Sequence, residues 1–160
     1  MPFKRVLINS SHYWILFALL NSIELYLFPS GKGIDKTLLA ALFAFWCFCQ
    51  VMNYKCHALL ASFRRSPKPK SEEGDYQNAT KVRQIPYGLG FNQVSCANYF
   101  WEAMGWLTFA VVTRNYSAVL FLVFSVVQMA KWAKDKHRRY KKEFGDKYPK
   151  GRKAMFPFIF

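Results

Sequence analysis

Residues 85–102 read IPYGLGFNQVSCANYFWE, a turn-rich segment that leads directly into an apolar one of membrane-spanning character. If the apolar part is helical from about Ser95, then Asn98 and Glu102 lie four residues apart on one face. Tyr99 falls about 100° around the helix from Asn98 and about 60° from Glu102. A carboxylate inside an apolar span costs about 2.5–3.5 kcal/mol on insertion scales, so we expect Glu102 to face protein, water or a ligand. This polar arc is the first candidate for a functional site.

The composition favours a membrane protein over a protein that binds nucleic acid. The chain has 160 residues, which is enough for one domain, and we treat residues 1–160 as a single unit. Its net charge is +14 and 19% of its residues are aromatic. The excess of positive charge suits either nucleic acid or a membrane surface, but several apolar stretches approach the length needed to cross a bilayer. We therefore predict an all-α integral membrane domain that does not bind nucleic acid.

Four apolar segments are predicted to cross the membrane as helices. A cap at Ser10-Ser11 starts the first, and Arg114-Asn115 makes a tight turn between the last two. Glu24, inside the first segment, either makes an interfacial or interhelical hydrogen bond or lines a polar cavity. A basic C-terminal helix or tail follows the fourth segment. The predicted spans cover residues 12–28, 37–52, 95–113 and 116–130.

The basic regions of the chain predict which side of the membrane each connection faces. Residues 65–84 are polar, contain proline and glycine, and are typical of an exposed loop. Residues 131–153 hold eleven Lys or Arg against three acids, which is typical of a segment attracted to anionic lipid. With four spans, the N-terminus, the 65–84 loop and the basic tail lie on one side. The positive-inside rule makes that side cytosolic, so the sequon at Asn78 would carry no glycan.

The second predicted helix continues beyond its apolar part with a stripe of polar residues. Asn53, His57 and Arg64 fall within about 40° of one another on a helix. One interpretation is a face turned toward a ligand. The other is that His57 is a hydrogen-bonded interface histidine and Arg64 an anchor whose charged end reaches the membrane surface. Spacing alone does not decide between them.

The cysteine and histidine residues do not predict a metal site. The cysteines stand at positions 47, 49, 56 and 96, in or beside apolar segments, and none forms a C-x-x-C pair. The three histidines are dispersed along the chain. We interpret the cysteines as buried thiols and expect no bound metal. We expect the closing aromatic residues Phe156, Phe158 and Phe160 to fold back on protein or membrane.

Three stretches of this sequence, taken together, resemble the C-terminal domain of the steroid 5α-reductase family. They are SCANYFWE at 95–102, WAKDKHRRYKKEF at 132–144 and KAMFPFIF at 153–160. The similarity extends back through residues 53–64 to the N-terminus, and within the family it is greatest to the enoyl-CoA reductases. Relatives are about twice as long, with an N-terminal ubiquitin-like region and additional spans that include a lysine proposed to be catalytic.

The resemblance implies a cofactor site and a reaction. In the family the cytosolic half of the helical bundle holds NADPH, and the reaction is reduction of the 2,3 double bond of trans-2-enoyl-CoA. His57 stands where enoyl-CoA reductases carry histidine, and Tyr99 where they have their proposed proton donor. Glu102 would lie beside the nicotinamide and complete the catalytic pair. The positions implied to bind the cofactor are Asn53, His57, Arg64, Asn98 and Tyr140.

The family also implies a setting for this reaction. That setting is very-long-chain fatty acid elongation in the endoplasmic reticulum membrane, with an acyl-CoA lipid as substrate and members of the elongase complex as partners. Two alternatives stay open. One is a truncated membrane subunit without activity. The other is a SAM-dependent methyltransferase of the isoprenylcysteine type, which carries Arg-x-Glu-Glu where this chain has a single acid, Glu143.

Overall fold

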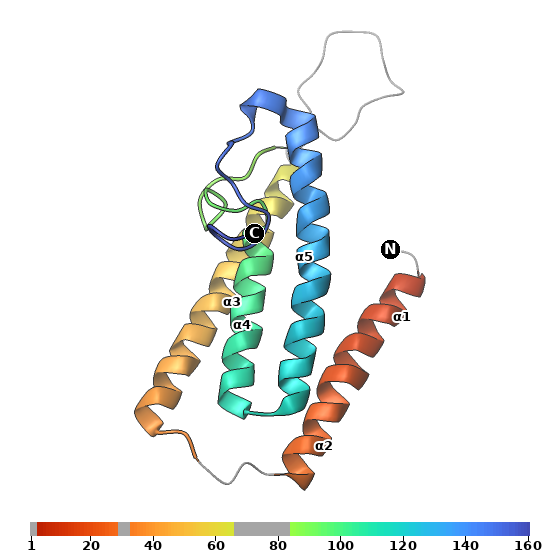
Figure 1. Ribbon diagram of the computed structural model, residues 1–160, viewed down its shortest axis with the longest axis vertical. Coiled ribbons are helices and arrows are strands. Elements are labelled where there is room, and N and C mark those ends of the chain that lie inside the picture. The colour runs from red at the N-terminus through yellow and green to blue at the C-terminus, as the bar shows by residue number, and fades with distance from the viewer. Residues whose placement is uncertain (1–2, 29–32, 66–83) are drawn as a thin grey trace.

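A computed structural model of the protein describes residues 3–28, 33–65 and 84–160, and these ranges fold into a bundle of helices (Figure 1). The described ranges contain no strand, and Val94 and Lys153 form an isolated bridge between extended segments. The predicted loop at 65–84, including Asn78, falls almost wholly outside the described residues. The elements in chain order are α1 Phe3–Ser11, η1 His12–Leu19, α2 Leu20–Leu27, α3 Lys36–Arg65, α4 Ala97–Thr113, α5 Tyr116–Phe144 and η2 Gly145–Lys147.

The first helix begins earlier than the sequence predicted. The elements α1, η1 and α2 form one helical stretch from Phe3 to Leu27, and η1 has the wider π-helical turn. The predicted cap at Ser10-Ser11 is wrong, because Ser11 has helical backbone angles and makes no side-chain capping bond. No proline or glycine interrupts this part of the chain, so the helix continues through the two serines. It ends at Leu27, because Phe28 precedes Pro29 and the helical conformation is disfavoured for a residue before proline.

Helix α3 is a single helix of 30 residues, which confirms that the second span continues to Arg64. The Asp35 carboxylate starts it by accepting hydrogen bonds from the backbone N–H groups of Thr37 and Leu38 at 3.0 and 3.1 Å. Helix α4 begins at Ala97, two residues after the predicted start, because the backbone of Ser95 is bonded to the C-terminal segment instead.

Helix α5 runs without a break from the fourth apolar segment into the basic tail. Its 29 residues extend to Phe144, so the predicted basic C-terminal helix continues directly from the fourth apolar segment. Between α4 and α5 the chain turns at Arg114, whose φ of 55° is left-handed, as expected for a tight connection.

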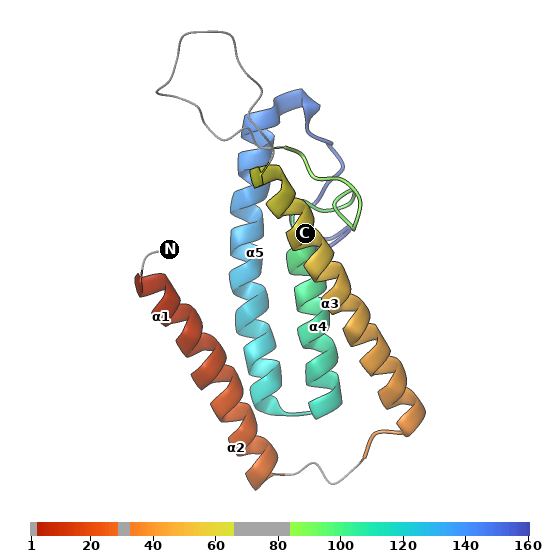
Figure 2. The same cartoon turned by 180° about the vertical axis from the view of Figure 1, so that it is seen from behind.

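The prediction of an all-α integral membrane domain is confirmed. Within the described residues, three helical stretches are long and apolar enough to cross a membrane: Val6–Leu27, Lys36–Arg64 and Tyr116–Lys147. Helix α4 has 17 residues, the lower end of the range for a spanning helix, and lies between α3 and α5 in both views (Figures 1 and 2). The crossing by α4, and with it the count of four spans, stays a prediction.

The buried core lies where α4 begins, between α3, α5 and the C-terminal segment. One cluster joins α4 and α5 to the C-terminal segment and includes Ala103, Met129 and Met155. A second joins α3 to residues 91–97 and includes Cys56 and Phe91. Phe156 packs against the first cluster, so the expected folding back of the aromatic end is confirmed for this residue. Phe158 is 83% exposed.

The cysteines are free thiols, as predicted. Those at 49, 56 and 96 are buried, whereas Cys47 is only half-buried. In the described part of the chain no group of three His, Cys, Asp or Glu residues is arranged to hold a metal ion.

Candidate functional site

Glu102 faces protein rather than lipid. It lies on α4, and its Oε1 accepts a hydrogen bond from the hydroxyl of Tyr13 on η1 at 3.4 Å. His57 on α3 is close enough for its charge to act on the Glu102 carboxylate. Tyr13 is held there by aromatic contacts, with ring centroids 5.8 Å from Phe121 and 6.4 Å from Trp106. Residues from two other helices, η1 and α3, therefore face the one carboxylate in α4.

Glu24, the acid of the first predicted span, makes hydrogen bonds between helices, which was one of the two predicted roles. Its carboxylate accepts the backbone N–H groups of Tyr116 and Ser117 at 2.7 Å each. It also borders an apolar cavity of about 580 Å³ between α2 and α5. Beside it the Asn115 amide donates to the Asn21 carboxamide oxygen at 2.8 Å. Glu24 thus joins the first helix to the start of α5, away from the arc on α4.

Asn53 on α3 and Asn98 on α4 carry acceptors that are buried without a donor. Within the described residues, neither carboxamide oxygen has a hydrogen-bond partner. Leaving a buried acceptor unpaired costs about 1–3 kcal/mol, so a donor from a ligand would stabilise both. The carboxamide N–H and ribose O–H groups of a nicotinamide dinucleotide are donors of this kind. The two asparagines therefore fit the predicted cofactor.

The helices α3 and α4 approach closely because a glycine faces their interface. A Cβ atom added at Gly105 would lie 2.9 Å from the side-chain nitrogen of Gln50 and 3.9 Å from Cys49 Cβ. Small residues at such contacts allow helix backbones to come together in a membrane. This approach brings the α3 residue Asn53 to the same interface as the arc on α4.

Tyr99 is turned toward α5. Its hydroxyl lies 3.0 Å from the Nζ of Lys136, and the same ammonium lies 4.5 Å from the centre of the Tyr99 ring. Tyr99 is half-buried and packs against the cluster that joins α4 and α5. Tyr99 therefore meets α5 whereas Glu102 meets η1, and the shared role of the arc stays a prediction.

A second set of polar side chains connects the residues just before α4 to the last part of α5 and the residues after it. Ser95 Oγ lies 2.5 Å from His137 Nδ1 and 2.5 Å from the hydroxyl of Tyr148. The ring of Tyr140 stacks on that of Tyr148, with centroids 5.7 Å apart and planes 6° apart. The resemblance assigned Tyr140 to the cofactor site, and it gave no role to Ser95 or Tyr148.

Arg152 was assigned to the lipid-facing basic tail, and that prediction is wrong. Its side chain is 3% exposed. The guanidinium lies over the rings of Tyr87 and Tyr148, at 4.7 and 5.5 Å from their centres. A guanidinium stacks well on aromatic faces, and two rings compensate part of its lost hydration. In the sequence, Arg152 follows Tyr148 by four residues, in the run Tyr-Pro-Lys-Gly-Arg at 148–152. This closeness along the chain is the only sequence feature that links the arginine to one of its aromatic partners.

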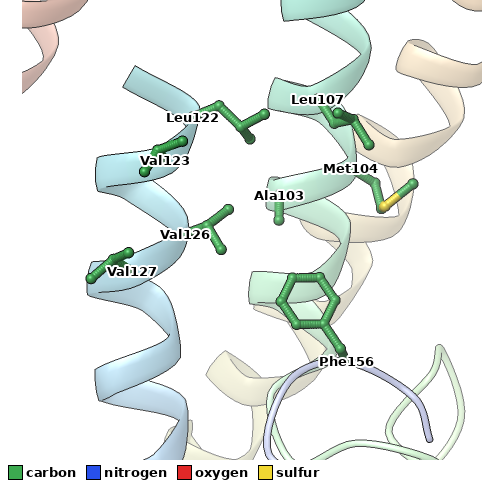
Figure 3. Close-up of a pocket in the computed structure, with 8 residues that line it drawn as sticks. All are labelled: Ala103, Met104, Leu107, Leu122, Val123, Val126, Val127 and Phe156. Carbon is green, nitrogen blue, oxygen red and sulfur yellow. The ribbon is translucent and has the colours of Figure 1, made fainter. Parts of the chain in front are cut away.

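The structure brings some of the predicted residues together and leaves others apart. Asn53 and His57 lie on α3, which packs against the helix that carries Asn98 and Glu102, whereas Tyr99 on that helix is turned toward α5. His57 and Arg64 are exposed, so their roles stay predictions. The described cavities include none of the predicted site residues. The groove between α4 and α5 is entirely apolar and has a volume of about 300 Å³; Phe156 lies at the end of it nearest the C-terminal segment (Figure 3).

A family model described as 3-oxo-5-alpha-steroid 4-dehydrogenase matches residues 1–160. A very-long-chain enoyl-CoA reductase of Dictyostelium discoideum is 36% identical over 159 residues, covering 99% of this chain and 48% of that protein. A Schizosaccharomyces pombe protein with a provisional enoyl reductase name is 36% identical over 160 residues, covering 99% of this chain and 50% of the relative.

A 3-oxo-5-alpha-steroid 4-dehydrogenase 1 of Rattus norvegicus is 34% identical over 117 residues, covering 73% of this chain and 40% of that protein. The chain spans about half the length of the curated relatives it matches. The match along the whole sequence shows that this chain belongs to the 3-oxo-5-alpha-steroid 4-dehydrogenase family, the steroid 5α-reductase family that its sequence motifs resemble.

Proposed function

We propose that this chain forms the cofactor-binding part of a membrane reductase that uses NADPH to reduce the 2,3 double bond of trans-2-enoyl-CoA. The relatives that match over 99% of the chain are named enoyl reductases, whereas the steroid-reducing relative matches over 73%. The observation that carries the proposal is the arc on α4. It places a tyrosine hydroxyl, a carboxylate and an unpaired carboxamide within one turn of helix.

The residues of the arc have distinct tasks in this reaction. Bound NADPH supplies the hydride that adds to C3 of the enoyl thioester. Tyr99 donates its hydroxyl proton, either to the thioester oxygen as negative charge builds there or directly to C2. Asn53 and Asn98, whose carboxamide oxygens lack a donor, would accept hydrogen bonds from the bound cofactor. Glu102, held by Tyr13, orients the nicotinamide amide.

Arg64 and Tyr140 extend the proposed cofactor site toward the polar end of the bundle. Arg64 follows His57 by seven residues, about 10 Å further along α3. Its planar guanidinium suits phosphate because it pairs with two oxygens at once. Tyr140 lies near the end of α5, and the ends of α3 and α5 are at the same end of the bundle (Figure 1).

We also propose where the protein works. Very-long-chain fatty acid elongation places it in the endoplasmic reticulum membrane, beside members of the elongase complex. The ends of α3 and α5 lie at the same end of the bundle, and the end of α5 is basic, which supports cytosolic termini (Figure 1). Cysteines introduced near Lys70 and Lys150 should react with an impermeant maleimide from the cytosolic side. Protection there, with labelling near Lys32 instead, would invert the topology.

The decisive experiment is Tyr99→Phe, which removes one hydroxyl and keeps the ring. We expect turnover to fall roughly 10²-fold, with NADPH affinity nearly unchanged, because the hydroxyl acts on the developing charge and not on the cofactor. Tyr26→Phe is the matched control, since Tyr26 is 86% exposed on α2.

The assay uses the chain alone and co-expressed with the N-terminal half of a full-length relative, because the chain spans half the length of those relatives. Activity that survives Tyr99→Phe in the complemented enzyme would remove the catalytic role of Tyr99. A complemented enzyme that neither binds NADPH nor turns over would favour a non-catalytic membrane subunit.

A further inference from the structure

The contact between Lys136 and Tyr99 fixes the direction in which the tyrosine can donate its proton. An ammonium has three donors and no acceptor, so in the 3.0 Å bond the Tyr99 oxygen is the acceptor. The proton of the Tyr99 hydroxyl takes no part in this bond. It is therefore free to be given to a second acceptor on the other side of the oxygen.

The surroundings of Lys136 make its charge effective at this place. The side chain is half-buried against the beginning of α4, and its charge also acts on the neighbouring Cys96 thiol. Within the ranges 3–28, 33–65 and 84–160, no carboxylate lies within ion-pair distance of the Lys136 ammonium. A partly desolvated charge interacts more strongly than one in water. The Tyr99 oxygen and ring are its described partners.

The backbones on both sides of the contact are held in place. His137, next to Lys136, is bonded to Ser95 Oγ at 2.5 Å, and the Ser95 N–H donates to the carbonyl of Lys153 at 2.8 Å. Tyr99 follows Ser95 by one turn, at the start of α4. The position of α5 along α4 is therefore set at the level of Lys136 by bonds that do not involve Lys136 itself.

We propose that Lys136 is a positioning residue for proton transfer, a role that rests on the proposed reductase function. It holds the Tyr99 hydroxyl with the proton aimed at the substrate. When the hydride has added to C3, the O–H bond of Tyr99 breaks and a C–H bond forms at C2. The phenolate left behind faces the ammonium, and water then returns a proton to it. Reduction consumes one hydride and one proton, and Lys136 itself gives up neither.

The test compares Lys136→Met with Lys136→Arg and with the control Lys134→Met in the complemented enzyme. Lys134 is exposed on the same helix. We expect Lys136→Met to lower kcat about tenfold or more, with KM for enoyl-CoA and Kd for NADPH changed less than twofold. Lys136→Arg should recover most of the loss because it restores a cationic donor. Lys134→Met should match the wild type.

A double variant separates positioning from general damage. If Lys136 acts through the Tyr99 hydroxyl, adding Lys136→Met to Tyr99→Phe should cost nothing further in kcat, since the group it positions is already absent. Independent, multiplying losses in the double variant would overturn the proposal. A loss in Lys136→Met that appears only in KM or in NADPH binding would overturn it as well.

A spectroscopic measurement tests the contact between Lys136 and Tyr99 without relying on enzyme activity. With 3-fluorotyrosine incorporated, the ¹⁹F resonance that disappears in Tyr99→Phe belongs to Tyr99. It should shift in Lys136→Met and stay in place in Lys134→Met; an unmoved resonance in Lys136→Met would overturn the proposal. A complemented wild type that binds NADPH but does not turn over would refute the reductase function, and the ¹⁹F shift would still decide the Lys136–Tyr99 bond.

Discussion

Replacing Glu24 tests whether this residue, which lies in the first helix, caps the beginning of α5 and so joins the first helix to the rest of the bundle. The first N–H groups of a helix have no acceptor within it. In α5, those of Tyr116 and Ser117 donate instead to the two oxygens of Glu24, each at 2.7 Å. The carboxylate also places negative charge at the positive end of the helix dipole. Glu24→Ala removes both bonds and the charge.

The size of the effect follows from these contacts. Losing a side-chain cap costs about 0.5–2 kcal/mol, and bonds to a charged acceptor lie at the upper end. Glu24 is partly exposed, so water replaces some of the interaction and the two bonds do not add in full. We expect Glu24→Ala to lower the free energy of unfolding by about 1–2 kcal/mol. Glu24→Gln should lose about half of that, because the amide keeps one oxygen acceptor.

The measurement is unfolding in mixed micelles, followed by tryptophan fluorescence, together with amide hydrogen exchange. Asp135→Ala, at an exposed position on α5, is the control and should change stability by less than about 0.5 kcal/mol. The amides of Tyr116 and Ser117 should exchange faster in Glu24→Ala. If stability equals that of the wild type and these two amides keep their protection, Glu24 is not the cap of α5.

Two further predictions concern the proposed cofactor site and the start of α4. Arg64→Ala should weaken NADPH binding more than NADH binding, by about 1.5–3 kcal/mol, if Arg64 contacts the 2′-phosphate; equal losses in a fluorescence titration would assign it to another part of the cofactor. The Cys96 thiol is 1% exposed and belongs to the cluster that joins α4 and α5 to the C-terminal segment. A buried thiol is hard to reach, so maleimide should modify Cys96 at pH 7.5 much more slowly in the folded protein than after unfolding in denaturant. Rapid labelling of Cys96 in the folded protein at pH 7.5 would contradict its burial.

The sequence predicted the membrane class and most helix ends for local reasons. Apolar runs of bilayer length predicted spanning helices, and Pro29 and the Arg114-Asn115 turn predicted two of their ends. The prediction failed at Ser10-Ser11, because a serine caps a helix only where the chain before it is not already helical. Helical spacing also predicted the arc of Asn98, Tyr99 and Glu102, since angles around a helix depend on residue number alone.

Only the tertiary structure decided what each of these side chains meets. Periodicity shows which residues share a face of a helix, but not which helix lies against that face. The bond from Lys136 to Tyr99 joins residues 37 apart, and that from the Tyr116 N–H to Glu24 joins residues 92 apart. The burial of Arg152 likewise depends on Tyr87, a residue 65 positions earlier in the chain. The sequence by itself determined the helices and the polar arc, whereas packing between distant segments decided the partners, because only packing brings such segments within hydrogen-bond distance.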